Sequence, residues 1–403
     1  MGHDDRVRFL HTSDWHLGKG LHGHDLAEAQ QVALDAVIDL AIEREVDAFV
    51  IAGDVFDRAF PSVDDVRRLN RALTRIHDAG IPIICTAGNH DEGARLAAYT
   101  NLLDAAVTVV GEYGQVGTAV ELEDEHGPVV FYPLPYLDPD GARRALAPEG
   151  GDLLDRTHEA VIGEAMQRVR ADLADRDPAT RAVVVSHAFV VRGDESDEAL
   201  ADEQSDSERD LSVGGVPYVP SAVYRGAHYV ALGHLHGPRT VQEADPMIRY
   251  SGSLLRYSVS ETAHEKSVTI VDLNASGACT VEVVPVPQPA GMARLHGTLT
   301  EVLSDEHASH RDDFVEIVLT DAVLPDNYAA QLAHVFSRML RVGRDRGESA
   351  GAALETDAST FTLTTPAETL RTFYAAERGE EMSESMERIL DDVLERARAA
   401  VED

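Results

Sequence analysis

Short apolar runs alternate with longer amphipathic stretches over residues 1–285 of the chain. The runs have the length of buried strands, and the stretches between them place apolar residues at the spacing of a helix. The expected strands are Val7–His11, Ala48–Ala52, Ile81–Thr86, Val129–Tyr132, Ala182–Ser186 and His228–Leu232, and the expected helices are Leu26–Glu45, Val63–Ala79 and Leu153–Leu173. Strands that alternate with helices predict a layered α/β domain whose sheet is largely buried on both faces.

Three later segments have the pattern of consecutive strands without helices between them, namely Ile248–Ser253, Ser267–Leu273 and Thr280–Pro285. They are expected to add antiparallel members to the sheet. The stretch that follows, Val284–Gly291, has the sequence VPVPQPAG, and its prolines hold the backbone extended. Such a stretch predicts a domain boundary, so residues 1–285 are expected to form the first domain.

A small α+β module is expected next, over residues 286–363. Its strands are predicted at Ala293–Leu303 and Phe314–Thr320, and its helix at Tyr328–Leu340. The inward face of that helix is expected to consist of Leu332, Val335, Phe336 and Met339.

The last segment, residues 364–403, has the pattern of two helices. Thr365-Pro366-Ala367-Glu368 combines an N-cap, a proline in the first turn and a capping-box glutamate. Gly379 is expected to separate this helix from the last one, whose apolar stripe is Met382, Met386, Ile389, Val393 and Ala397. Such a helix either packs on its own domain or docks on a partner, and the sequence leaves both interpretations open.

Composition excludes several classes of protein. The chain has 403 residues, of which 44% are apolar, so a globular core is expected rather than a disordered or fibrous chain. No apolar stretch approaches the roughly 20 residues of a membrane-spanning helix, and the start, MGHDDRVRFLHTSD, lacks the apolar core of a signal peptide. Two cysteines, Cys85 and Cys279, cannot form a disulfide framework, so a cytoplasmic protein is expected.

Acidic residues outnumber basic ones, 71 Asp and Glu against 35 Lys and Arg, for a formal charge of −36. This balance argues against a broad surface that binds nucleic-acid phosphates, and we interpret it as a solubility or salt-adaptation feature. Lysine occurs only at Lys19 and Lys266, so arginine carries nearly all the positive charge. The acidic stretch Arg192–Gly215, rich in serine and glycine, is either a solvated loop or a lid that contacts substrate.

Residues able to bind metal ions follow five of the expected strands. In chain order they are Asp14 and His16, then Asp54, then Asn89, then His187, and last His234 with His236. Because the carboxyl ends of parallel strands share one edge of a sheet, these five loops are expected to converge in one crevice. Gly53, Gly88 and Gly233 stand beside them and would let the backbone approach closely.

Imidazole and oxygen donors without thiolates suit Mn, Fe, Zn or Co better than a soft metal. The seven donors are too many for one tetrahedral ion, but they suit two ions that share a bridging carboxylate. Asp54, on a tight Gly-Asp turn, is the natural bridge. Each motif alone is weak evidence, whereas the ordered set predicts a dinuclear metal site.

The same blocks carry a family resemblance. LHTSDWHLGKG, AGDVFDR, AGNHD and ALGHLHGP resemble the signature of the calcineurin-like metallophosphoesterases, and most closely that of the D subunit of the bacterial SbcCD exonuclease, from the Mre-type DNA-repair nucleases. These blocks span residues 9–238, and RYSGSLLRYSVSE (Arg249–Glu261) with VPVPQP extends the resemblance towards residue 290. The resemblance implies a layered α/β/β/α sandwich, followed by a small α+β capping domain and C-terminal helices.

The resemblance also implies how the site works. One ion would be held by Asp14, His16, Asp54 and His236, and the other by Asp54, Asn89, His187 and His234, with Mn the expected metal. A water activated by the two ions would attack the phosphodiester. His90 would be a catalytic group that stabilises or protonates the leaving oxygen, and Asp91 would orient its ring. Asp57 stands where some relatives have a histidine, so a second catalytic imidazole is not expected there.

By the same resemblance, the chain would be a DNA nuclease subunit for repair and recombination, with 3′–5′ exonuclease activity and endonuclease activity on single strands or hairpins. It would act as a homodimer with an SbcC-type coiled-coil ATPase, in a 2:2 assembly. DNA contacts are expected at Trp15, Arg58, Arg192 and Arg256, and ATPase contacts at Leu370, Phe373, Met386, Ile389 and Val393. Trp15 could instead wedge its loop against the core, and the dimer contact is expected at residues 62–79 or 95–106.

Two other functions remain open from the sequence. A small-molecule or cyclic-nucleotide phosphodiesterase of the same superfamily would have nearly the same ligands, although the extra residues after the prolines favour the nuclease. A non-enzymatic scaffold with a relic site is the third interpretation, and the complete set of donors argues against it.

Overall fold

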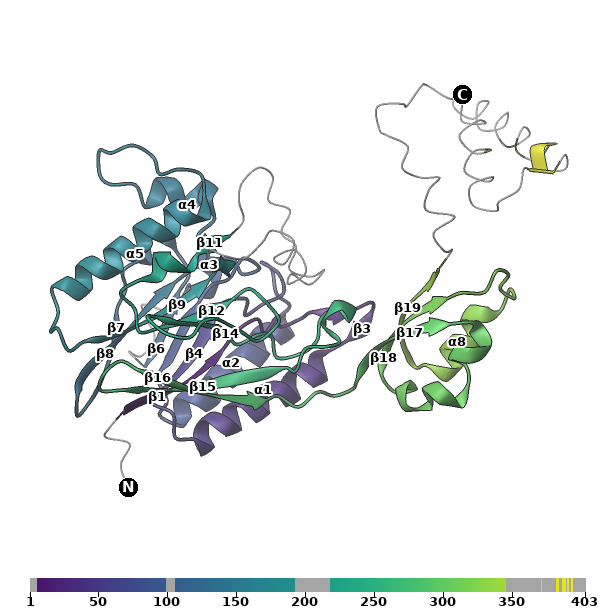
Figure 1. The fold of residues 1–403 in the computed structure, drawn as a ribbon, viewed down its shortest axis with the longest axis horizontal. Coiled ribbons are helices and arrows are strands. Elements are labelled where there is room, and N and C mark those ends of the chain that lie inside the picture. The colour runs from purple at the N-terminus through teal and green to yellow at the C-terminus, as the bar shows by residue number, and fades with distance from the viewer. Residues whose placement is uncertain are drawn as a thin grey trace.

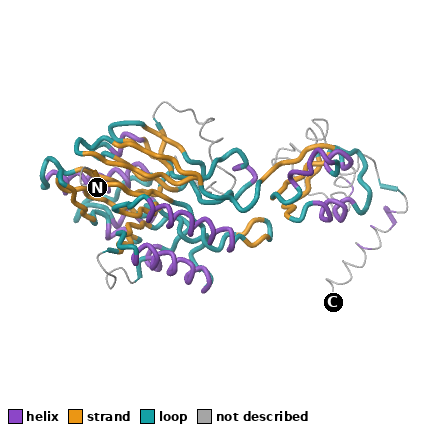
Figure 2. Tube along the Cα trace, turned by 90° about the horizontal axis from the view of Figure 1, so that it is seen from below, coloured by secondary structure: helices purple, strands orange, loops and turns teal. Residues whose placement is uncertain are grey.

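Figure 1 shows the computed structural model of the chain, which describes residues 6–98, 106–192 and 218–345 and a few single positions from 371 onwards. Two six-stranded sheets pack face to face in the larger part of the molecule. Each sheet has helices on its outer face (Figures 1 and 2), so the layers run α/β/β/α. The layered sandwich implied by the family resemblance is confirmed.

The first sheet has the strand order β16-β15-β1-β4-β5-β6. The strands are β1 (Arg6–Thr12), β4 (Ala48–Ala52), β5 (Ile83–Thr86), β6 (Val107–Val110), β15 (Ser267–Asn274) and β16 (Cys279–Pro285). Strands β1, β4, β5 and β6 are parallel, while β15 and β16 run antiparallel to their neighbours. Helices α1 (Ala27–Glu43) and α2 (Val63–Asp78) cover the outer face through an apolar cluster that includes Leu34, Ile38 and Ile76.

The second sheet has the strand order β13-β14-β12-β9-β8-β7. The strands are β7 (Val120–Asp124), β8 (Gly127–Leu134), β9 (Arg181–His187), β12 (Tyr229–Gly233), β13 (Arg239–Gln242) and β14 (Met247–Tyr250). The four central strands are parallel, and the two outer strands are antiparallel. Helices α4 (Pro139–Ala145) and α5 (His158–Ala174) pack on its outer face.

The space between the sheets is filled by a separate apolar cluster. Phe9 of β1 makes edge-on contacts with the rings of Phe131 and Tyr229, at centroid separations of 5.3 and 5.5 Å, and all three residues are fully buried. Strands β1, β4 and β5 belong to one sheet, and β8, β9 and β12 to the other, as the α/β/β/α sandwich implied by the resemblance requires. An apolar run carries no information about which of two stacked sheets it joins.

Side-chain caps determine where two of the helices begin. Ser62 precedes α2 and Thr157 precedes α5, and each side chain accepts a hydrogen bond from the backbone N–H three residues later. The expected helix Leu153–Leu173 therefore begins only at His158, because Thr157 is in an extended conformation. Shorter elements complete this part: β2 (Gly20–Leu21), β3 (His24–Asp25), α3 (Gly93–Leu96), η2 (Tyr113–Gln115), β10 (Val190–Val191), β11 (Val219–Pro220), η3 (Ser221–Tyr224) and η4 (Val259–Glu261).

A three-stranded parallel sheet follows the prolines, to the right in Figure 1. Its elements are β17 (Met292–Gly297), α7 (Leu299–Val302), η5 (Asp305–His310), β18 (Phe314–Leu319), α8 (Tyr328–Val335) and β19 (Arg338–Arg344). Leu332 and Phe336 are buried in its core, while Val335 and Met339 are partly buried against it. This part is thus a small α+β unit with its own apolar core.

Two expectations for this unit were wrong. The predicted strand Ala293–Leu303 ends at Gly297, because Thr298 and Glu301 form a capping box that starts α7. The predicted helix Tyr328–Leu340 ends at Val335, and Arg338–Arg344 forms a strand instead. Backbone pairing with the open edge of β18 overrides the helical pattern there.

Several predicted features fall outside the described residues. They are most of the loop Arg192–Gly215, part of the expected dimer surface 95–106, and Leu370, Phe373 and Ile389 among the expected partner contacts. Met386 and Val393 are described, and both are exposed. Within the described residues, no helix combines the length and apolarity needed to span a bilayer.

Candidate metal centre

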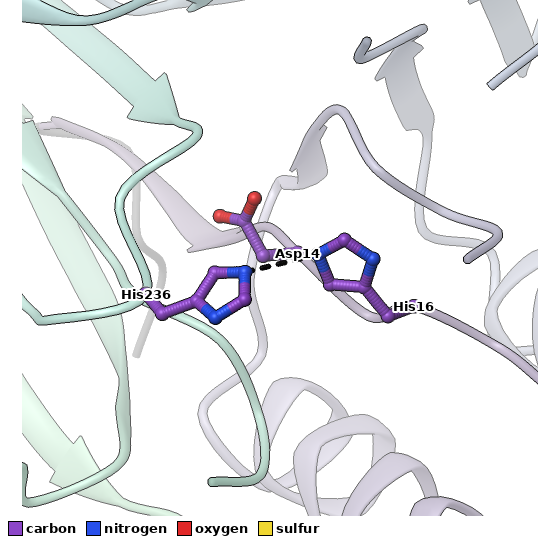
Figure 3. Close-up of side chains that lie close together, drawn as sticks. All are labelled: Asp14, His16 and His236. Carbon is purple, nitrogen blue, oxygen red and sulfur yellow. Dashed lines mark hydrogen bonds between the residues drawn. The ribbon is translucent and has the colours of Figure 1, made fainter. Parts of the chain in front are cut away.

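The loops that carry the seven predicted metal donors converge, although they come from two sheets. Figure 3 shows Asp14 and His16, from the loop after β1, beside His236, from the loop after β12. The backbone N–H of His234 donates to the Asp14 carboxylate at 3.1 Å, which ties these two loops together. All the donors except Asn89, which is half-buried, are buried.

One group of donors consists of Asp14, His16 and His236. One potential ligand atom from each lies within 4.8 Å of the other two. Nε2 of His16 is 3.0 Å from Nε2 of His236 and 3.6 Å from Oδ2 of Asp54. Three imidazole and carboxylate donors, with Asp54 at their side, therefore surround one small volume.

A second group forms on the other side of Asp54. Nε2 of His187 lies 3.5 Å from Oδ2 of Asp54 and 2.9 Å from Oδ1 of Asn89. Nδ1 of His234 lies 3.1 Å from the same Asn89 oxygen. The same Asp54 oxygen thus faces a histidine of each group, which is the position a bridging carboxylate would take.

The glycines beside the donors are required by close packing. A Cβ added to Gly88 would overlap Oδ1 of Asp54, and one added to Gly53 would overlap the ring of His187. Gly53 also has a φ of +86°, which side-chain-bearing residues rarely adopt. These contacts bear out the expectation that glycine lets the backbone approach closely here.

Four of the donors have a left-handed backbone. Asp14, His16, Asp54 and His234 have φ values of 52°, 45°, 51° and 110°, a conformation that costs free energy for residues other than glycine. Backbone hydrogen bonds between the loop after β1 and the loop after β4 hold this conformation. The N–H of Asp14 donates to the carbonyl of Gly53, and the N–H of His16 donates to the carbonyl of Asp54, each at 3.0 Å. Backbone strain that is retained at these four positions indicates a functional requirement for the direction of their side chains.

Neighbouring groups fix the orientation of two donor histidines. Nδ1 of His187 donates to the carbonyl of Ala52 at 2.9 Å, which leaves Nε2 as the nitrogen that faces Asp54 and would bind a metal ion. Nδ1 of His236 lies 2.9 Å from Oε1 of Glu261, and Lys266 donates to the other oxygen at 2.7 Å. Sequence reasoning missed Glu261 and Lys266, although Lys266 is one of only two lysines.

The electrostatics of the group favour a cation. Burial disfavours the charged form of the Asp54 carboxylate, but His187 and His16 hold the pKa of Asp54 well below its ordinary value. Burial likewise opposes charge on His187, yet Asp54 raises its pKa to about 9. Burial lowers the pKa of His234 to about 3 and that of His16 well below its usual range, so both rings are neutral donors.

The donor set fits two divalent cations of the Mn, Fe, Zn or Co type. Imidazoles, carboxylates and one amide oxygen meet in two groups that share Asp54, without a thiolate among the described residues of the centre. Nδ1 of His16 is a buried nitrogen without a hydrogen-bond partner in the described chain.

His90 lies at the rim of the site, half-buried. Its Nδ1 donates to the backbone carbonyl of Asp57 at 2.9 Å. Its ring packs edge-on against the ring of His16, with the ring centroids 4.7 Å apart. The expectation that Asp91 orients this ring was wrong. The Asp91 carboxylate instead accepts hydrogen bonds from the backbone N–H groups of Val55, Phe56 and Gly88, so it shapes the loops around Asp54.

The expected DNA contacts lie in different environments. Trp15 is completely buried, donates to Thr12 and packs against Phe49, so it wedges its loop and cannot stack on a base. Arg58 is exposed, 3.6 Å from Asp57 at the rim of the site. Arg192 is exposed after β10, and Arg256 is half-buried and donates to the carbonyl of His264.

Two segments of the chain match family models. Residues 7–238 match the model described as calcineurin-like phosphoesterase. Residues 288–378 match the model SbcD_C, described as the Type 5 capsule protein repressor C-terminal domain.

Solved structures also align with the chain. A protein of Thermus thermophilus, TT1561, aligns with a TM-score of 0.38 and 14% identity over 69% of this chain and 99% of that protein. A dimetal phosphatase from Danio rerio aligns with a TM-score of 0.40 and 13% identity over 70% of this chain and 100% of that protein.

Proposed function

The chain belongs to the calcineurin-like phosphoesterase family and is a metallophosphoesterase of the SbcD type, and we propose that it is the nuclease subunit of an SbcCD-type complex. The family resemblance found in the sequence is thereby confirmed, and with it the class of enzyme, a hydrolase with a dinuclear metal site. One observation carries the nuclease proposal: the phosphoesterase segment is followed in the same chain by the SbcD_C segment, residues 288–378.

The proposed ligand sets follow the two groups of donors. One cation is assigned to Asp14, His16, Asp54 and His236, and the other to Asp54, Asn89, His187 and His234, with Mn proposed as the metal. When bound, two such ions supply an activated water and stabilise charge on the phosphate oxygens. The chain's contribution is to aim the donors, through Glu261, the Ala52 carbonyl and the tight glycine turns.

His90 is proposed as the general acid. Its Nδ1–H is held by the carbonyl of Asp57, so Nε2 is the nitrogen left to act on the substrate. In the imidazolium form Nε2 carries a proton that it can donate to the leaving oxygen of the sugar. Edge-on packing against His16 keeps the ring beside the donors.

The charge of the chain limits how DNA can be held. A balance of −36 repels a DNA backbone at long range, so few phosphates can be contacted directly. Arg58 supports such a contact, because its side chain is 69% exposed and lies at the rim of the centre. Arg256 is less suited, since its guanidinium already donates to the His264 carbonyl.

Partners would supply the remaining affinity. We propose that residues 286–363 form the capping domain and that residues 364–403 dock on an SbcC-type ATPase. The start of α2 supports a homodimer, because Phe60, Val63 and Val66 expose apolar side chains there, at 73%, 67% and 47%. A cytoplasmic location agrees with these partners.

The test compares two substrates with the purified full chain. With Mn, we expect degradation of linear duplex DNA as well as hydrolysis of bis-p-nitrophenyl phosphate, and faster DNA degradation when an SbcC-type ATPase is added. Asp54→Ala should abolish both activities and serves as the control for contaminating nucleases. Hydrolysis of the small diester without any DNA cleavage, with or without the ATPase, would instead identify a small-molecule phosphodiesterase.

A further inference from the structure

A cavity of about 710 Å³ lies beside the metal centre, at the open edge of the sandwich next to β14, β15 and β16. Its polar lining includes Arg239, Arg249, His264 and Ser267. None of these residues is among the seven metal donors, although the lining residue Gly237 directly follows His236. The volume is within the range of about 300–1,000 Å³ that small-molecule sites occupy.

Arg249 is the most unusual residue of this cavity. It is only 8% exposed, and its guanidinium donates to the hydroxyl groups of Thr269, at 3.1 Å, and Thr240, at 2.7 Å. Both partners are uncharged. No carboxylate of the described chain forms an ion pair with it, and burial lowers its pKa, as expected for a cation held without a counter-charge.

Other buried arginines show that this chain normally pairs such a charge. Arg181 binds Asp124 at 2.5 Å, and Arg68 binds Asp65 at 2.7 Å. With 71 acidic residues against 35 basic ones, a carboxylate partner for Arg249 would be easy to supply. A buried cation without an opposite charge is costly in free energy, and an anionic ligand in the adjoining cavity would supply that charge.

Two further buried polar atoms of the lining lack a partner. Oγ of Ser267 and Nδ1 of His264 make no hydrogen bond with any described residue, and Ser267 is only 1% exposed. Ser267 stands two residues before Thr269 on β15, so its side chain is on the same face of the strand as the threonine that holds Arg249. The residues that carry the buried cation and the two unsatisfied polar atoms therefore all line one cavity.

We propose that this cavity binds the phosphate group of a small ligand, through the Arg249 guanidinium, the Ser267 hydroxyl and the His264 ring. Donors on different segments suit a tetrahedral oxyanion, whereas a planar carboxylate would use the guanidinium fork alone. Apolar side chains of Pro238, Val283 and Pro285 complete the walls and would accommodate an organic part such as a nucleoside. The carboxylate of Glu265 also lines the cavity, but this residue is exposed and can turn to solvent.

The test is isothermal titration calorimetry of the full chain in EDTA, which removes metal ions and so separates this cavity from the metal centre. Inorganic phosphate is the first probe, deoxyadenosine monophosphate the second, and acetate the control anion. Arg249→Gln should weaken phosphate binding at least tenfold. Ser267→Ala should weaken it about threefold, the effect of one hydrogen bond, without a loss of stability, because no protein partner of the hydroxyl is lost.

Arg225→Gln is the matched control, since Arg225 is exposed and does not line the cavity, and its binding should equal that of the wild type. Tighter binding of the nucleotide than of phosphate would identify a nucleotide as the ligand, and equal binding would identify free phosphate. The proposal is overturned if the wild type does not bind phosphate, if acetate binds as tightly, or if Ser267→Ala and a folded Arg249→Gln bind as the wild type does. None of these results depends on nuclease activity.

Discussion

Nδ1 of His236 lies 2.9 Å from the carboxylate of Glu261. Lys266 donates to the second oxygen of this carboxylate and also to the backbone carbonyl of His236, so the three residues form one buried unit. Burial alone would raise the pKa of Glu261, but His236 and Lys266 hold it well below its ordinary value. The charged carboxylate fixes the ring of His236 with Nε2 towards His16.

Glu261→Gln tests this relationship. We expect metal affinity to fall about 10- to 100-fold, because the ring of His236 loses the group that orients it. The free energy of unfolding should fall by about 3 kcal/mol, since the buried Lys266 ammonium loses its counter-charge. Metal titration and urea denaturation measure the two effects. Glu282→Gln is the control, because Glu282 pairs with Arg44 at the surface. Unchanged metal affinity in Glu261→Gln would refute the proposal that Glu261 orients the ring of His236.

His90→Ala should leave both metal ions bound and lower the rate of DNA cleavage, because the leaving oxygen of the sugar needs a proton. Loss of general-acid help typically costs about 10²- to 10⁴-fold in rate. Metal content and steady-state kinetics on the same preparation separate the two effects. His77→Ala, which changes an exposed histidine of α2, should behave as the wild type. Loss of a metal ion from His90→Ala would show that His90 is a ligand.

Gly88→Ala should disrupt the metal centre through packing alone. The added Cβ would overlap the side chain of Asp54, so the carboxylate must move from its place between the two groups of donors. We expect loss of bound metal, measured by metal analysis after gel filtration. In Gly163→Ala, within α5, the new Cβ meets nothing within 4 Å, and the helix should gain about 0.5–1 kcal/mol of stability. Normal metal content in Gly88→Ala would contradict the assigned geometry.

A buried ion pair far from the metal centre predicts a pH-dependent stability. Burial alone would raise the pKa of Asp124, but hydrogen bonds from Arg181 lower it below the ordinary value. The stabilisation is therefore present above the unfolded pKa, about 3.9, and is lost as the pH falls through the lower folded pKa. Asp124→Asn should cost about 3 kcal/mol at pH 7, and this difference should shrink below about pH 4, as measured by urea denaturation. A difference that does not change with pH would be inconsistent with an ionised Asp124.

The sequence predicts the elements and donors whose signal is local. Each metal donor follows an apolar run directly, and the glycines beside Asp54 and His187 mark the close approaches. Strand pairing is not local, so the division into two sheets and the strand β19 could not be read from periodicity. The role of Asp91 was missed for a similar reason: its carboxylate binds N–H groups of a loop some 35 residues earlier in the chain.

Residues that support the donors are harder to recognise. Glu261 and Lys266 lie more than 20 residues after His236 and meet it only in the folded chain, and a lone Glu or Lys in a sequence is normally a surface residue. The rarity of lysine was the available signal, since Lys266 is buried and Lys19 binds Asp57 beside the site. The cavity proposed to bind phosphate is lined by separate stretches of the chain, so no sequence motif indicates it.

We propose that seven side chains hold two cations that share Asp54. The most direct test is the amount of Mn retained per chain after equilibration and gel filtration, for the wild type and for Asp54→Ala, with circular dichroism to confirm that the variant is folded. We predict two ions per wild-type chain and fewer than one per chain of the folded Asp54→Ala variant. A wild type that holds at most one ion, or an Asp54→Ala variant that still holds two, would contradict the claim.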